Sequence, residues 1–153
     1  RINKDWPAAL AAIDGLISVD PTAFPYQMQK FTLLLVDMND PAQAYAFGEK
    51  MTQNFWDDAQ PLNALAWEVV DNPKVQTRNL DFALKTAQRA SELTENKEGA
   101  ILDTLARVHY EKGDLKEAVK WQKKAVENAP EPMAAELKAA LEKYENELAN
   151  KGG

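Results

Sequence analysis

Residues 100–130 combine two amphipathic helical patterns with a tight turn between them. In the first pattern, Leu102, Leu105 and His109 recur at three- and four-residue intervals, which places them on one side of a helix. Gly113 is expected to end that helix, because glycine adopts the left-handed backbone of a helix C-terminus at little cost. This segment is therefore predicted to fold as a pair of antiparallel helices.

The second helix of this pair carries its own start and stop signals. Asp114 occupies the N-cap position, and Glu117, three residues later, is the expected partner in a capping box. Pro130 ends the pattern. The small residues Ala106 and Ala118 should let the two backbones approach closely, since a larger side chain would wedge the helices apart.

The same stretch resembles a tetratricopeptide repeat, a helix pair of roughly 34 residues. His109 stands at the aromatic position of the first helix of that repeat, and Ala118 and Pro130 match the second helix outright. The departure is Gln122, where the family has an apolar ring. The neighbouring Trp121 is expected to supply the missing bulk.

The pattern recurs along the chain. Small residues equivalent to Ala118 are found at Ala9, Ala44 and Ala83, with successive spacings of 35, 39 and 35 residues. These spacings are close to the period of roughly 34 residues that the repeat family shows. The longer step coincides with residues 72–79, which extend the turn between two helices.

No alternating strand pattern occurs, so the sequence predicts an all-α protein that forms a single domain. The resemblance implies a right-handed helical-repeat solenoid of antiparallel helix pairs, with about 3.5 repeats and a C-terminal capping helix. It divides the chain into a half repeat at 5–21, repeats at 25–57, 61–95 and 99–130, and a capping helix at 132–149.

Helix boundaries can be predicted for several segments. Helical patterns cover residues 6–19, 26–36 and 80–93, while Pro41 and Pro61 open two further helices. The last segment is apolar on one face and rich in Glu and Lys on the other, as a terminal helix needs if it covers the last repeat and faces water. The apolar face consists of Met133, Leu137, Leu141, Tyr144 and Leu148.

The charge, apolar content and cysteine count of the chain exclude several kinds of partner and chemistry. A formal charge of −6 argues against nucleic acid as a partner, because phosphates are bound through lysine and arginine. The 45% hydrophobic and 27% charged content is typical of a soluble protein. No apolar run approaches the roughly 20 residues that span a membrane. Cysteine is absent, which excludes disulfides and thiolate chemistry but leaves the compartment open between cytoplasm and periplasm.

No group of titratable residues converges on a catalytic, cofactor or metal site. His109 is the only histidine, and its repeat position indicates a packing role. The adjacent Asp57 and Asp58 are typical of a solvated turn, since no calcium-loop spacing follows them. We therefore expect a protein that is not an enzyme and binds neither cofactor nor metal.

In the tetratricopeptide family, the first helix of each repeat lines a concave groove that holds a peptide or a helix of a partner. Carried over by register, the resemblance implies a row in which Trp67 is flanked by Lys30 and Arg107. Aromatic residues and arginine are enriched at binding hot spots. The alternative, that Trp67 and Tyr26 are buried between helices, remains open. The implied groove residues are Tyr26, Gln29, Lys30, Leu33, Asn63, Trp67, Asp103, Arg107, Tyr110 and Glu111.

Two hypotheses for the function follow. The first is a non-catalytic module that binds a peptide or partner protein. The alternative is a C-terminal helical appendage, for docking or dimerisation, of a thioredoxin-like redox enzyme. Residues 63–71 are similar to helical segments that follow thioredoxin-like domains in some bacterial redox proteins, and a chain that starts at Arg1 fits that hypothesis. Homo-oligomerisation is left open, and neither nucleic acid nor a membrane is expected as a partner.

Overall fold

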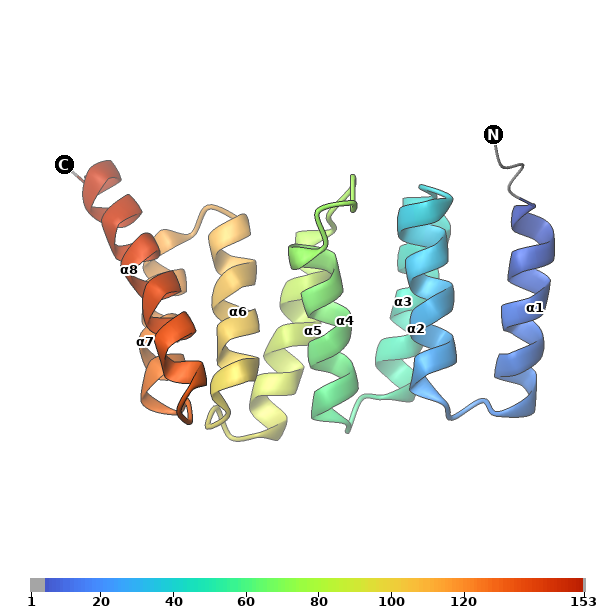
Figure 1. The fold of residues 1–153 in the computed structure, drawn as a ribbon, viewed down its shortest axis with the longest axis horizontal. Coiled ribbons are helices and arrows are strands. Elements are labelled where there is room, and N and C mark those ends of the chain that lie inside the picture. Colours follow the sequence, from blue (N-terminus) through green and yellow to red (C-terminus); the bar gives the residue numbers. More distant parts are fainter. Residues whose placement is uncertain (1–4, 153) are drawn as a thin grey trace.

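The computed structural model describes residues 5–152, and this part of the chain is helical without any strand (Figure 1). A five-residue π-helical turn, η1 (Leu33–Asp37), directly extends α2. The α-helices are α1 (Trp6–Val19), α2 (Phe24–Thr32), α3 (Pro41–Asn54), α4 (Ala59–Asp71), α5 (Leu80–Leu93), α6 (Gly99–Glu111), α7 (Leu115–Glu127) and α8 (Met133–Gly152). The prediction of an all-α protein is confirmed.

The helices follow one another along the long axis of the molecule and overlap in depth, with α1 at one end and α8 at the other, and consecutive helices run antiparallel (Figure 1). Most helices that follow each other in the chain pack together, above all α4 with α5 and α6 with α7, whereas α3 and α4 make few or no contacts. Helices two apart also touch: α2 and α6 both contact α4, while α3 contacts α5. The even-numbered helices α2, α4 and α6 therefore form one layer, and α3 and α5 form another.

Helix starts follow the capping signals of the sequence. Asp5, Asp40 and Asp114 each accept a hydrogen bond from the backbone N–H three residues on, at 3.1, 3.1 and 3.3 Å. Asn79 caps α5 in the same way at 3.0 Å. Gly113 has a φ of 84°, the left-handed conformation expected of it. The predicted cap at Asp114 and the predicted left-handed turn at Gly113 are confirmed.

The capping box at the start of α7 is only half formed. Glu117 does not return a bond to Asp114; its carboxylate instead accepts from the Trp121 indole N–H at 3.1 Å. The Asp114 N–H donates to the His109 carbonyl at 2.9 Å, closing the turn after α6. The predicted reciprocal bond is therefore wrong, because both groups have found other partners.

Several helix boundaries differ from the predictions. Helix α2 begins at Phe24 instead of Tyr26, and α4 begins at Ala59 instead of Pro61. The apolar run at residues 33–36 forms the π-helical turn, in which Leu34 and Leu35 are both buried.

Aromatic rings fill the contact between α2, α3 and α5. Phe31 lies edge-on to Tyr45 and stacked on Phe82, with ring centroids 5.9 and 6.2 Å apart. Gly48 makes room for them: a Cβ there would lie 2.8 Å from Phe82 and 3.0 Å from Phe31. Gly15 has no such role, because nothing lies within 4 Å of its Cβ position.

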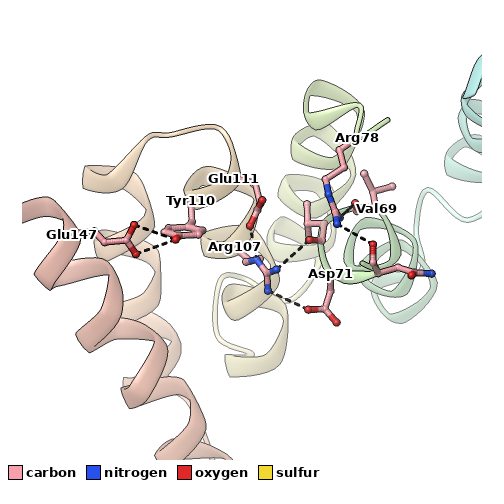
Figure 2. A network of polar contacts seen from close by, with 9 residues as sticks. Val69, Asp71, Arg78, Arg107, Tyr110, Glu111 and Glu147 are labelled. Carbon is pink, nitrogen blue, oxygen red and sulfur yellow. Dashed lines mark hydrogen bonds and ion pairs between the residues drawn. The ribbon is translucent and has the colours of Figure 1, made fainter. Parts of the chain in front are cut away.

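The long turn at 72–79 is fixed at several points. Tyr45 donates to the Thr77 carbonyl at 2.6 Å and accepts from the Asn79 N–H at 3.0 Å. Arg78 donates to the carbonyls of Val69 and Asn72 (Figure 2), so the loop is tied to the end of α4. The insertion that lengthens the repeat spacing is thus an ordered part of the fold.

The small residues between the last helices support a test of packing. Ala106 and Ala118 are fully buried in one cluster with Tyr144. Ala106→Leu and Ala118→Leu should each lower the free energy of unfolding by about 1–3 kcal/mol through overpacking, measured by urea denaturation. Ala139→Leu, at an exposed position of α8, is the control and should change it by less than about 0.5 kcal/mol. Equal effects at all three positions would contradict this packing.

His109 supports a test that depends on pH. The side chain is 8% exposed, and burial lowers its pKa below the ordinary 6.5, although Glu117 and Asp114 act to raise it. The unfolded chain then binds more protons, so the free energy of unfolding falls as pH drops below 6.5. His109→Phe should fold and should lack this loss, because the chain has no other histidine.

Urea denaturation of the wild type and His109→Phe at about pH 7.5 and about pH 5 measures the difference directly. We expect the variant to gain stability relative to the wild type as the pH is lowered. A variant that fails to fold, or one whose stability relative to the wild type is the same at both pH values, would contradict a neutral packing role.

Candidate functional site

A cavity of about 290 Å³ lies between α4, α6 and α8. Helix α4 supplies Trp67, and α6 supplies Asp103 and Arg107. Helix α8 forms the opposite wall. The lining residues are Trp67, Asp103, Arg107, Glu136, Leu137, Ala140 and Tyr144. Three residues predicted for the binding face are therefore gathered at one place, and the last helix completes it.

Trp67 combines the two roles that the sequence left open. Its ring is partly buried and packs against the main hydrophobic core, and it also lines the cavity. The Arg107 guanidinium lies over the ring, 5.7 Å from its centroid. Among the described residues, the indole N–H finds no hydrogen-bond acceptor. Trp67 is thus a half-buried ring that lines the cavity and whose N–H has no acceptor within residues 5–152.

Arg107 connects α6 to the end of α4 (Figure 2). Its Nε donates to Glu111 Oε2 at 2.9 Å, and its Nη1 donates to Asp71 Oδ1 at 3.2 Å. Its Nη2 donates to the Val70 carbonyl at 3.3 Å. Burial acts against the guanidinium charge, but Glu111 and Asp71 outweigh it and raise the pKa of Arg107. The positive charge of Arg107 is therefore already neutralised by two carboxylates within the protein.

Asp103 carries its carboxylate into the partly dehydrated interior of the site. Burial raises its pKa above the ordinary 3.8, against the lowering effects of the Gln122 hydrogen bond and Arg107. Glu136 and Asp71 raise the pKa further. Asp103 is therefore a partly buried carboxylate whose surroundings hold too little positive charge.

Gln122 is polar at a position that is apolar in the repeat family, and its hydrogen bonds account for the difference. Its side chain is fully buried, and its amide donates to Asp103 Oδ1 at 2.9 Å and to the Leu137 carbonyl at 3.0 Å. One glutamine thus joins α6, α7 and α8 behind the cavity. Trp121 beside it is partly buried and contacts several of the apolar clusters, so it supplies bulk at this junction.

Two tyrosines fix α8 against α6. The rings of Tyr110 and Tyr144 are stacked with centroids 4.6 Å apart. Tyr110 donates to the Glu147 carboxylate, whose oxygens lie at 2.9 and 3.1 Å (Figure 2), and the Lys143 ammonium lies over its ring at 4.9 Å. Burial first, and then the Asp103 charge, raise the pKa of Tyr144 to about 12.

The remaining predicted residues lie elsewhere. The Lys30 ammonium binds Asp14 at 2.7 Å and lies 4.7 Å from the Phe47 ring, so the expected flanking of Trp67 by Lys30 is not seen. Leu33 and Gln29 line a separate cavity of about 610 Å³. That cavity also contacts Phe24, Pro25, Met28, Thr32 and Asp37.

Tyr26 and Asn63 are both half-buried and line neither cavity. The Asn63 amide oxygen is buried and has no hydrogen-bond partner. Sequence reasoning missed the part of the site on α8, above all Glu136 and Tyr144. The apolar spacing identified Tyr144 as a packing residue, but nothing local in the sequence places it opposite Trp67.

No family model matches this sequence, and no curated protein matches it significantly. None of the helices formed by residues 5–152 is both long and apolar enough to cross a bilayer. Within the same residues, no three His, Asp or Glu side chains are arranged to hold a metal ion. What the site can do follows from its own geometry: it offers a half-open cavity with two aromatic rings, two carboxylates and a guanidinium.

Proposed function

We propose that the protein is a non-catalytic interaction module that binds a peptide or a segment of a partner protein at the cavity between α4, α6 and α8. The observation that carries this proposal is the gathering of Trp67, Asp103 and Arg107, from different helices, around one half-open space. Tryptophan, tyrosine and arginine are the residues most enriched among binding hot spots. The wall formed by α8 gives a partner side chain a defined end to the site.

We also propose that the architecture is a right-handed helical-repeat solenoid of the tetratricopeptide type, with α8 as its cap. Antiparallel neighbours and contacts between helices two apart support it. In such a stack each repeat contacts only its neighbours, so the terminal helix has an apolar inner face and a polar outer one. Helix α8 has this character: Leu137 and Tyr144 are buried, and Glu142 and Glu145 are exposed.

Trp67→Ala tests the binding function. Selection from a random peptide phage library gives ligands, whose affinity is then measured by isothermal titration calorimetry. Truncating a hot-spot tryptophan costs about 2 kcal/mol or more, so we expect at least a roughly 30-fold weaker Kd. The cost in stability should stay below the roughly 3–5 kcal/mol of a fully buried ring, because Trp67 is only partly buried.

Trp56→Ala is the matched control. Trp56 also carries an arginine over its ring, Arg89 at 4.9 Å, but it lies in the turn after α3 and outside the cavity. Its truncation should leave peptide affinity unchanged. Selected peptides that bind Trp67→Ala as tightly as the wild type would refute the proposed site, and a selection that returns no ligand would refute the function.

A second candidate function, the docking or dimerisation appendage of a thioredoxin-like enzyme, is favoured by α1. This helix fully buries only Ile13, while Leu16 and Val19 are 44% and 85% exposed. A cavity of about 390 Å³ beside them is lined by α1 and α2. Sedimentation velocity of the wild type and Leu16→Glu tests self-association. A wild-type monomer at all concentrations would remove dimerisation through this face.

A further inference from the structure

The charges around the cavity do not balance. Asp103 and Glu136 line it, while Arg107 is already paired with Asp71 and Glu111. Four carboxylates and one guanidinium therefore lie in or next to the cavity. An anionic ligand would meet this excess of negative charge, whereas a cation would reduce it. The electrostatics of the site therefore favour a positively charged ligand group.

The cavity also contains polar atoms that the protein leaves without partners. Tyr144 is 4% exposed and lines the cavity, yet its hydroxyl forms no hydrogen bond with any residue in 5–152. The second carboxylate oxygen of Asp103 likewise accepts no hydrogen bond from the described chain, since Gln122 bonds only to Oδ1. Both atoms remain accessible, since among the described residues the fully buried side-chain atoms without a partner belong to Asn63 and Gln122. They can therefore form hydrogen bonds with a ligand group in the cavity.

We propose that this cavity takes the side chain of a lysine carried by the partner segment, with its ammonium group between Asp103, Glu136 and the Tyr144 hydroxyl. The inference rests on the proposed binding function and names the chemistry of its partner. Lysine fits because it joins a compact ammonium with three donors to a flexible apolar stem. The stem would lie along Leu137, Ala140 and the Trp67 ring, which supply the apolar part of the lining.

Size and existing contacts favour lysine over other cations. A volume of about 290 Å³ lies just below the roughly 300–1,000 Å³ of small-molecule sites, so it suits one side chain. An arginine of the partner would compete with Arg107 for the face of Trp67. An ammonium group beside Asp103 would also supply the positive charge that this partly buried carboxylate lacks, and would lower its raised pKa.

Titrations followed by ¹H–¹⁵N NMR test the recognition of the ammonium group. The probe is n-butylammonium chloride, and sodium butyrate is the control of equal chain length and opposite charge. We expect n-butylammonium alone to give saturable shifts of the Trp67 indole N–H and of the amides of Leu137 and Ala140. Equal shifts with butyrate, or no saturable shift with either probe, would overturn the inference.

Replacing each cavity carboxylate by its neutral amide tests which carboxylates bind the ammonium group. Asp103→Asn keeps an acceptor for Gln122, and we expect it and Glu136→Gln each to weaken n-butylammonium binding at least tenfold. Glu142→Gln is the matched control, because Glu142 is exposed on the same helix and lies outside the cavity. The amide spectra report whether each variant is folded. Folded Asp103→Asn and Glu136→Gln variants that bind as the wild type does would overturn the inference.

Peptide binding distinguishes a lysine side chain of a partner from a free small amine as the ligand. In the peptides from phage selection, one lysine is replaced by norleucine. We expect this replacement to weaken the affinity for the wild-type protein at least tenfold. The affinity for Asp103→Asn should not change, because that variant has already lost the carboxylate that binds the lysine. Ligands that bind at the cavity without needing lysine would overturn this inference and leave the proposed function intact. Binding of n-butylammonium without any lysine-dependent peptide would identify a free amine as the ligand, which overturns the inference too.

Discussion

Phe31→Ala is expected to lower the free energy of unfolding by about 3–5 kcal/mol, the range for truncating a fully buried aromatic ring. Phe31 has no exposed surface and contacts the rings of Tyr45 and Phe82, so three helices lose packing at once. Gly48 on α3 already approaches the Phe31 ring closely and cannot fill the space. In thermal unfolding, we expect a fall in Tm of roughly 6–20 °C.

The control for this prediction is Val19→Ala. Val19 is among the most exposed large apolar side chains, so its truncation should change the free energy of unfolding by less than about 0.5 kcal/mol. Urea denaturation followed by circular dichroism at 222 nm measures both variants. A loss below about 1 kcal/mol for Phe31→Ala would contradict the aromatic core between α2, α3 and α5.

Tyr144→Ala is expected to have an effect of similar size, about 3–5 kcal/mol, at the opposite end of the molecule. The ring is buried, stacks on Tyr110, and packs on the small residues Ala106 and Ala118. Its loss leaves a void between α6, α7 and α8, because alanine at those positions cannot fill the space. The same variant should lose ligand binding, since α8 forms one wall of the cavity.

Tyr144→Phe separates the ring from the hydroxyl. The hydroxyl has no hydrogen-bond partner within residues 5–152, so its removal should change the free energy of unfolding by less than about 1 kcal/mol. Chemical denaturation of the two variants, with the amide spectrum as a check of the fold, gives the comparison. Equal destabilisation by Phe and Ala would show that the hydroxyl holds the fold together and is not free for a ligand.

Sequence reasoning succeeded where the cause of a structure is local. The left-handed turn at Gly113 and the cap at Asp114 depend on a few neighbouring residues, and the structure confirms them. Helical periodicity was enough to predict an all-α chain. The bounds of α1 and α5 also match the predictions, because each follows an Asp or Asn cap that fixes its first turn.

The composition of the candidate site depends on tertiary packing, which the sequence pattern does not encode locally. Lys30 pairs with Asp14 on α1, a choice set by which helix lies beside α2. Glu136 and Tyr144 belong to the cavity only because α8 packs against α6. Gln122 departs from the apolar residue of the repeat pattern because its amide bonds to groups on α6 and α8, which lie far from it in the sequence. Repeat register therefore identified the α4 and α6 side of the site alone.

A crystal structure of the protein with a selected peptide tests the central claim most directly. We predict that the peptide lies across α4, α6 and α8, with a lysine ammonium group within hydrogen-bond distance of the carboxylates of Asp103 and Glu136. Its apolar stem should contact the Trp67 ring. A peptide seated in the cavity of α2 beside Leu33, or on the exposed face of α1, with the cavity at Trp67 empty, would contradict the claim.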